Sequence, residues 1–541
     1  MGSVISAPLG AAKALRAVIS TLRDIAADYN ALHVRVNAKA ELPVPSPTEP
    51  YWLRDPPYPE LVDTQSPSQP SEADVVIIGS GIAGAAVAWS LLHGRERGSQ
   101  ESSGSDISGP PLPSVVVLEA RQMCSGATGR NGGHIKASPH ETFARLRKKM
   151  PPERAAAVVR FQLSHLETIV DLCRHERIDQ AEAREVETVD LYLSKESYDQ
   201  AVRQVEELQI WVPEFRMTTW TASEAQKHFN TNSHVEGAIS YRAGALWPYR
   251  FVTSIWRKLL DKFPKSLRIE TGTPVLNITS RPSSTFPYEI TTSRGVIRCS
   301  RVVHATNAYA SHLIPGLKGK LTGLVAHMSS QRPGKDFPHY DGKRSWSIIY
   351  GTAGFDYVTQ RPGTKSAPGD ILLGGGFCRS RNQGLDHVGV YDDSKRDALT
   401  TAHILGVFPT IFEPNWGRRL DGLADKVWTG VIGVVADFRP LVGRLDSRLT
   451  GRRVIPSGRE ETEPGQPGEW VAAGFIGDGM VWAWLSGTAI GVMVSGREDE
   501  DLPAAPGIPS GKLHDWFPVE LLPEYGRVKR MDMTALADEI A

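Results

Sequence analysis

Hydrophobic residues form two short continuous runs between residues 75 and 118. Residues 75–78 are four consecutive β-branched residues, and residues 114–118 form a second, mostly apolar run. Such runs are typical of strands buried on both faces of a parallel sheet. Small apolar residues at 85–92 follow the first run and predict a helix. A strand, a turn and a helix in this order predict the opening unit of a doubly wound α/β fold.

The middle of the chain alternates apolar and polar residues instead. Residues 237–247 are strand-like up to a helix that begins near Pro248, and strand-like segments recur at 320–328 and 345–360. This pattern predicts an antiparallel sheet in an α+β domain that interrupts the first domain twice. We expect an N-terminal helix and proline-rich arm at 1–72, the Rossmann-like α/β domain at 73–185, 247–320 and 421–500, the antiparallel-sheet domain at 186–246 and 321–420, and a tail at 501–541.

The turn after the first strand is rich in glycine. Gly79 allows a tight turn, Gly81 removes a Cβ where backbone meets phosphate, and Gly84 allows helix and strand to pack closely. The N-terminus of the helix that follows this turn offers unpaired N–H groups and the positive end of its dipole. The turn therefore predicts a dinucleotide site. The alternative is a purely structural turn, because the motif alone is weak in a chain with 50 glycines.

Glu119 ends the second strand, where an acid accepts hydrogen bonds from ribose hydroxyls. The separation from Gly84 exceeds the usual ~20 residues, and the unpatterned stretch at 93–113 accounts for the excess. A solvated strand end is the alternative interpretation. A second glycine-rich loop at 120–134 follows directly. An NAD enzyme would proceed to a helix here, so this loop indicates a ligand with an additional ring system.

Composition limits the remaining classes of function. With 541 residues and 40% hydrophobic content, we expect at least two domains. Lysine plus arginine and aspartate plus glutamate number 61 each, so no overall field favours nucleic acid. The four cysteines have no C-x-x-C spacing, which argues against disulfides or a metal site. No apolar run approaches the ~20 residues of a membrane span, and a cytoplasmic location is expected.

The N-terminal segment has its own pattern. Residues 1–6 fit the M-G-x-x-x-[ST] myristoylation motif, and an apolar face recurs along residues 15–25. Membrane contact is expected only if Gly2 carries myristate, and a helix docked on the body is the preferred interpretation. Proline and serine are frequent at 42–72 and predict an extended arm that packs through Tyr51 and Trp52.

Four blocks together resemble the D-amino-acid oxidase superfamily of FAD-dependent amine oxidoreductases, which includes glycine oxidase, sarcosine oxidase and γ-glutamylputrescine oxidase. They are the glycine turn at 79–84 with the loop at 119–133, then 301–309, 370–376 and 472–480. The second loop resembles most the γ-glutamylputrescine oxidase branch and its fungal relatives. The resemblance spans residues 73–496 and implies FAD.

This resemblance implies a set of FAD-binding residues. They are Gly79, Gly81, Ile82, Ala83, Gly84, Glu119, Ala120, Arg121, Ala127, Thr128, Arg130, Asn131, Gly132, Gly133, Val275, Ala305, Thr306, Asn307, Gly474, Gly477, Asp478, Gly479 and Met480. Glycines in the last group let backbone approach a planar ring, and their helix directs N–H groups toward its N1/O2 side. Residues 427–433 lack the cysteine that joins sarcosine oxidase to its flavin, so non-covalent FAD is expected.

The implied reaction is oxidation of an amine or amino acid by hydride transfer to flavin N5, giving an imine and, with O2 as acceptor, hydrogen peroxide. Arg439 and Arg361 are candidates to clamp a substrate carboxylate, although either can be a structural ion-pair residue. Lys335 is a candidate lysine near N5. His134 is a candidate base that can also be a packing residue. The alternatives are a dehydrogenase of a biosynthetic pathway with another acceptor, a non-catalytic flavoprotein and nicotinamide-only binding.

Overall fold

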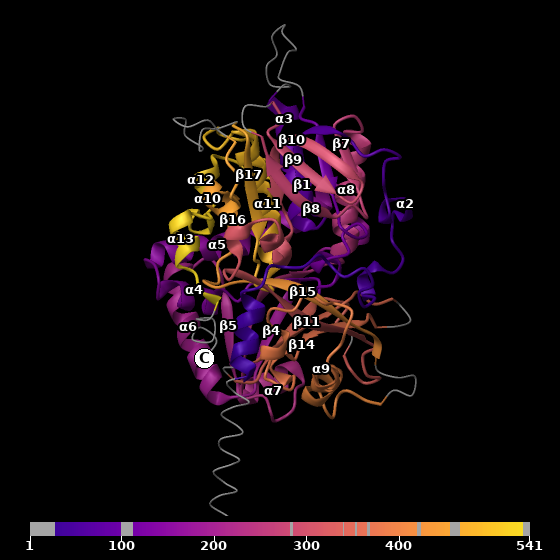
Figure 1. The fold of residues 1–541 in the computed structure, drawn as a ribbon. Helices are drawn as coiled ribbons and strands as arrows, with labels where there is room; N and C mark the ends of the chain where they lie inside the picture. Colours follow the sequence, from indigo (N-terminus) through magenta and orange to yellow (C-terminus); the bar gives the residue numbers. More distant parts are fainter. Residues whose placement is uncertain are drawn as a thin grey trace, which may run out of the picture.

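Two sheets organise the computed structural model of the chain (Figure 1). The structure describes residues 27–98, 112–281, 285–338, 340–351, 354–364, 368–418, 424–454 and 466–533. The myristoylation motif, the apolar face at 15–25 and most of the stretch at 93–113 lie outside these residues.

The first sheet contains both predicted apolar runs, as strands β1 (Glu72–Ile78) and β2 (Val115–Leu118). Its order is β16-β17-β10-β1-β2-β7, with β8 and β9 off this path. The other strands are β7 (Leu267–Glu270), β8 (Val275–Ser280), β9 (Tyr288–Thr292), β10 (Gly295–His304), β16 (Leu441–Arg444) and β17 (Gly468–Ala473). β1 lies between β2 and β10 and is parallel to both, which confirms the expected α/β class.

Helix α3 (Ile82–Gly98) begins directly after the glycine turn and packs against α11 (Ala483–Ser495) (Figure 1). Glycines make this close packing possible. A Cβ on Gly491 would lie 2.5 Å from Ser90 Cβ, and one on Gly487 would overlap the Ala83 carbonyl. The two helices therefore form one closely packed pair.

The second sheet has nine strands in the order β15-β11-β14-β13-β12-β4-β6-β3, with β5 paired to β6. They are β3 (His134–Ile135), β4 (Arg184–Tyr192), β5 (Met217–Thr221), β6 (Gly237–Ala245), β11 (Leu321–Gln331), β12 (Arg344–Ile349), β13 (Phe355–Gln360), β14 (Ile371–Gly375) and β15 (Ala424–Val435). The sheet is antiparallel except for the parallel pair β12 and β4.

The sheet corrects two predicted boundaries. β15 pairs with β11 along nearly its whole length, so the second sheet extends past residue 420, and the chain returns to the first sheet only with β16. β3 pairs with β6, so the second sheet also takes residues from the segment assigned to the first domain. The sequence pattern missed both because strand partners are chosen by contacts far along the chain.

Helices cover both sheets. α8 (Pro248–Lys262) packs on α3, α5 (Pro152–His175) contacts α11 and β4, and α9 (Ala398–Ile411) contacts β11 and β14. The other α-helices of the described residues are α2 (Pro59–Val62), α4 (Pro139–Arg147), α6 (Lys195–Trp211), α7 (Ala222–Phe229), α10 (Ser447–Thr450), α12 (Leu513–Trp516) and α13 (Tyr525–Arg530). The short 3₁₀ helices near the predicted site are η1 (Tyr51–Leu53), η2 (Ala127–Gly129), η4 (Asn307–His312) and η8 (Gly479–Val481).

The proline-rich arm packs as predicted. Tyr51 and Trp52 are buried and form an aromatic cluster with Trp247. The indole of Trp52 donates to the Asn131 carbonyl, and the indole of Trp247 donates to the Trp52 carbonyl at 2.7 Å. The arm is therefore part of the wall around the second glycine-rich loop.

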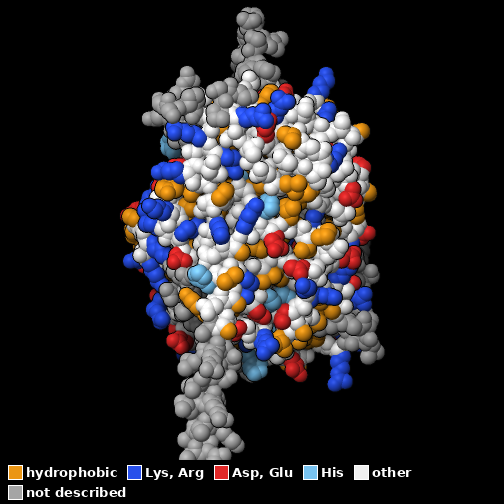
Figure 2. Space-filling view, in the orientation of Figure 1, with side chains coloured by type: hydrophobic (Ala, Val, Ile, Leu, Met, Phe, Trp, Pro, Cys, Tyr) orange, Lys and Arg blue, Asp and Glu red, His pale blue; other side chains and the backbone are white. Residues whose placement is uncertain are grey.

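The surface carries mixed charge. Basic and acidic side chains are interspersed over the face seen in Figure 2. The four cysteines are free thiols. Within the described ranges, no helix combines the length and the apolar character that crossing a bilayer requires.

Candidate functional site

The glycine turn between β1 and α3 has the geometry that its sequence predicted. Gly79 has a φ of +111°, which favours glycine. A Cβ on Gly84 would overlap the carbonyl oxygen of Gly79, so close packing requires glycine there. The Ile82 amide donates to Thr128 Oγ1 at 3.1 Å. Among the described residues, the Ala83 and Gly84 amides have no acceptor, so the helix start can bind an anion.

Glu119 stands beside this turn at the end of β2. Its Oε2 accepts from Ser80 Oγ at 2.7 Å and from the Ser80 amide at 3.1 Å, while Oε1 accepts from the Arg121 amide at 3.0 Å. The carboxylate is half-buried and has about four acceptor positions, so it can also accept from a ligand hydroxyl. The Thr273 amide donates to the Glu119 carbonyl at 2.8 Å, which brings Val275 to the same edge.

The second loop is held by a buried ion-pair centre at Asp393. Arg121 Nη1 lies 3.0 Å from Asp393 Oδ1, and Arg130 Nε lies 3.4 Å from Oδ2. Burial lowers the pKa of Arg130 to about 10, although Asp393 opposes this shift. Arg130 also donates to the Thr48 carbonyl at 2.8 Å and the Thr429 carbonyl at 2.7 Å. Its guanidinium thus joins the loop, the arm and β15.

Asn131 and Gly132 connect this loop to its neighbours. Asn131 Nδ2 donates to the Thr128 carbonyl at 2.9 Å and lies 3.9 Å from Met480 Sδ. The Gly132 carbonyl accepts from Thr359 Oγ1 at 2.7 Å. The loop at 126–133 therefore contacts both the C-terminal glycine-rich loop and the second sheet.

Asn307 joins the turn after β10 to the C-terminal loop. Its Oδ1 accepts from the Gly474 amide at 3.0 Å and the Phe475 amide at 3.3 Å. The Ala305 amide donates to the Ile78 carbonyl at 2.9 Å, so Ala305 and Thr306 lie beside the first glycine turn. The glycine turn, the turn after β10 and the C-terminal loop thus meet at the carboxyl ends of the parallel strands.

Open space remains along these loops. A Cβ at Gly126 would meet nothing within 4 Å, and one at Gly477 would meet only Ile432 Cδ1 at 3.6 Å. Gly477 and Asp478 are exposed although they belong to a loop between buried segments. Unpaired helix amides, an acceptor carboxylate and free space beside glycine backbone fit a dinucleotide with an attached ring system.

A polar cluster that the sequence analysis missed lies on the second sheet next to this space. Lys136 Nζ lies 2.7 Å from Asp190 Oδ1 and 2.7 Å from Ser347 Oγ, and Tyr241 donates to Asp190 Oδ2 at 2.6 Å. Burial alone would raise the pKa of Asp190, but Lys136, Tyr241 and His140 together outweigh burial and lower the pKa. Two features of the sequence could have indicated this cluster. Lys136 lies two residues after His134, which places both on one face of a strand, and Asp190 is a charged residue within an apolar run.

Burial determines the protonation of two predicted residues. It lowers the pKa of His134 to about 3, with Lys136 adding to the effect, and His134 Nε2 lies 2.9 Å from Ser345 Oγ. His134 is therefore neutral at physiological pH. Although the Asp478 side chain has accessible surface, enclosing protein raises its pKa to about 6, opposed by Arg145 and Lys136. This shift favours the protonated form of Asp478 up to about pH 6.

The two candidate arginines are already paired with carboxylates. Arg361 Nη2 lies 2.5 Å from Glu182 Oε1 and Arg439 Nη2 lies 2.7 Å from Asp437 Oδ2. Lys335 is exposed in the turn after β11. Leu321, at the other end of β11, packs near Gly474, and an 11-residue strand spans roughly 35 Å. Lys335 therefore lies far from the C-terminal glycine loop around Gly474, and the catalytic roles of all three side chains stay predictions.

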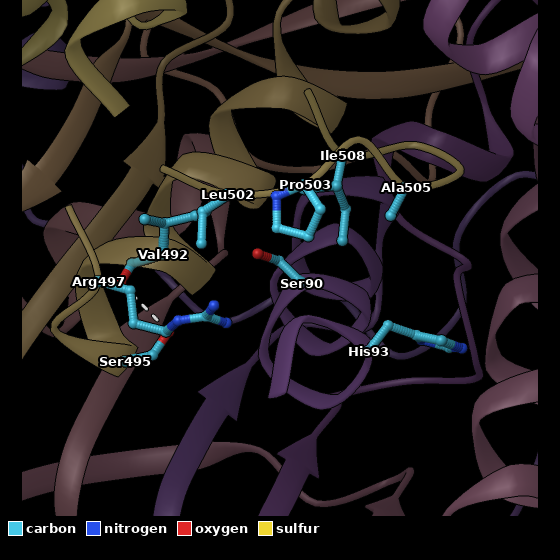
Figure 3. A pocket seen from close by; sticks show the side chains of 9 residues that line it. All are labelled: Ser90, His93, Val492, Ser495, Arg497, Leu502, Pro503, Ala505 and Ile508. Carbon is cyan, nitrogen blue, oxygen red and sulfur yellow. Dashed lines mark hydrogen bonds between the residues drawn. The ribbon is translucent and has the colours of Figure 1, made fainter. Parts of the chain in front are cut away.

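Another hollow lies between α3 and α11, bordered by Ser90, His93 and Val492 (Figure 3). Its volume is about 20 Å³, which suits a water molecule rather than a substrate. Ser90 is eight residues beyond the start of α3, or about 12 Å along the helix. This hollow is separate from the glycine loops.

The sequence model of one family, DAO, described as FAD dependent oxidoreductase, matches residues 74–491. Glycine oxidase from Geobacillus kaustophilus is similar with a TM-score of 0.57 and 16% identity over 81% of this chain and 98% of that chain. L-proline dehydrogenase from P.horikoshii has a TM-score of 0.57 and 20% identity over 86% of this chain and 100% of that chain. NikD, an amino acid oxidase essential for nikkomycin biosynthesis, has a TM-score of 0.53 and 15% identity over 82% and 98%. These likenesses show a shared fold. No curated protein matches the chain.

Proposed function

Because the chain belongs to the DAO family of FAD-dependent oxidoreductases, we propose that it oxidises the C–N bond of a small-molecule amine with non-covalently bound FAD. The observation that carries this proposal is the meeting of three glycine-rich segments and the turn after β10 around open space beside the second sheet. A flavin dinucleotide is the ligand that requires backbone contacts at so many separate points.

Each segment has a proposed part in holding FAD. The first turn of α3 would bind the pyrophosphate through its unpaired amides, and Glu119 would accept from the ribose hydroxyls. Val275 would border the adenine. The segments at 126–133 and 474–480 would enclose the ring system, with Asn307 keeping the second of these in place. Residues 427–433 contain no cysteine, which favours non-covalent binding.

When bound, FAD supplies a two-electron acceptor at its N5. The substrate loses a hydride from carbon and a proton from nitrogen, and water hydrolyses the resulting imine. With O2 as acceptor, two electrons and two protons give hydrogen peroxide. The chain's own task is to position a neutral amine and to exclude water. His134 is neutral and can hydrogen-bond without adding charge.

Two observations refine this proposal. Glu182 and Asp437 pair with the arginines that a substrate carboxylate would need, which favours an amine over an amino acid. The buried ammonium of Lys136 replaces Lys335 as the cation that we propose near the ring, where it would stabilise negative charge that forms during reaction with O2. Lys136→Met should therefore slow reoxidation of the reduced enzyme by O2 more than its reduction by amine.

The visible spectrum of the purified protein tests the function. We expect flavin absorbance that bleaches when pooled primary and secondary amines are added without oxygen, and that recovers in air with formation of hydrogen peroxide. Bleaching followed by recovery only with an artificial dye would instead indicate a dehydrogenase. A flavin that no amine bleaches would contradict amine oxidation, and a colourless protein that does not take up FAD would contradict the cofactor.

A further inference from the structure

A cavity of about 240 Å³ lies between α5 and an interrupted edge of the second sheet. β5 pairs with residues 237–241 of β6, and β3 pairs with residues 244 and 245 on the same edge. Arg242 and Ala243 therefore have no strand partner there within the described chain. The cavity occupies this interruption, bordered by Ile135 and Ala137 on the β3 side and Phe215 on the β5 side.

One wall of the cavity borders the predicted flavin loop. Val481, which directly follows Met480, forms part of its wall, and η8 contacts β3. Ala137 is adjacent to Lys136, and its carbonyl accepts from Tyr241 Oη at 3.3 Å. One wall of the cavity therefore lies next to residues of the C-terminal loop and of the Lys136 cluster.

A buried amide gives this cavity a hydrogen-bonding preference. Gln162 from α5 is 1% exposed and lines the cavity, and its Oε1 has no hydrogen-bond partner among the described residues. A buried carbonyl without a donor is unfavourable, so it favours a ligand that supplies an N–H group. Phe215, Leu166, Ile135 and Val481 provide apolar contact around it.

The rim favours a neutral group. Arg160 Nε lies 2.6 Å from Glu214 Oε1, and Arg242 Nη1 lies 2.7 Å from Glu167 Oε1. Each charged group on the rim thus has an opposite charge beside it. The volume is also below the roughly 300–1,000 Å³ of typical ligand pockets, which limits the occupant to one small ring system.

We propose that this cavity binds the non-reacting end of the substrate, an aromatic group with an N–H donor that bonds to Gln162 Oε1. The substrate class is then an arylalkyl amine whose ring lies against Phe215 while its amino group reaches toward the glycine loops. The assignment of the ligand as a substrate rests on the proposed amine oxidation. Binding of the ring in the cavity is independent of that function.

The test separates binding from chemistry. Indole and 1-methylindole have the same ring, but only indole has an N–H, and neither carries an oxidisable amino group. Calorimetric titration of the holoenzyme should show indole binding about three- to tenfold more tightly than 1-methylindole. Gln162→Leu should remove this preference, whereas the matched variant Gln204→Leu on α6 should keep it. Phe215→Ala should weaken both ligands.

In a second arm, tryptamine and 1-methyltryptamine are compared as reductants of the flavin without oxygen, and the wild type should show a lower KM for tryptamine. Equal binding of both indoles, no binding of either, or an unchanged preference in Gln162→Leu would overturn the proposal. Equal binding would also show that Gln162 bonds to a retained water. If the indole preference holds but no amine reduces the flavin, the cavity assignment stands and the proposed function fails.

Discussion

Replacing Asn307 should loosen the C-terminal loop and weaken FAD binding. Asn307 Oδ1 accepts hydrogen bonds from the Gly474 and Phe475 amides, and each bond contributes about 0.5–1.5 kcal/mol. Asn307 also has a φ of +45°, a left-handed conformation that costs a residue such as alanine about 1–2 kcal/mol. Asn307→Gly removes the two bonds without backbone strain and should cost about 1–3 kcal/mol, and Asn307→Ala should cost about 1 kcal/mol more.

Because the proposed FAD site includes the ordered loop, this cost should transfer to the affinity for FAD. A loss of about 1–3 kcal/mol corresponds to a roughly 5- to 150-fold rise in Kd, and Asn307→Ala should lie about fivefold higher again. Titration of apo-protein with FAD, followed by quenching of flavin fluorescence, measures both. Asn307→Asp keeps the acceptor and should stay near the wild type, as should the exposed Asn415→Gly. Wild-type affinity in Asn307→Gly, or an equal loss in Asn307→Asp, would refute the reasoning.

Three further changes test other parts of the site. Asp393→Asn leaves two buried guanidinium groups without their carboxylate and should destabilise the fold by about 3–5 kcal/mol in urea unfolding; a cost below about 1 kcal/mol would contradict the ion-pair centre. The folded pKa of Asp478, about 6, lies above its unfolded value, so wild-type stability should fall relative to Asp478→Asn as pH rises from 4 to 6. Parallel melting temperatures of the two proteins over pH 4–7 would argue against a raised pKa of Asp478. Gly84→Ala would place a methyl group on the Gly79 carbonyl and should lower both thermal stability and FAD affinity, with Gly406→Ala as a control in open space.

The sequence alone determined the strand, the glycine turn and the helix that begin the site, because each depends on residues close together in the chain. The apolar run before Gly79, the glycines of the turn and the acid at Glu119 each specify backbone geometry within a few residues, and the structure has the strand, turn and helix there. The fold class followed from the same patterns, because a strand buried on both faces needs helices on each side.

Tertiary structure alone decided which distant residues meet. The register of the strands in the second sheet brings Lys136 and Tyr241 to the carboxylate of Asp190. Arg361 pairs with Glu182 although 179 residues separate them. A buried charge is stable only beside a partner, and the fold decides which residues become buried together. No local sequence pattern specifies these pairs. The sequence could therefore predict that a dinucleotide binds and where its loops begin, while sheet pairing and side-chain partners determined what surrounds the ring.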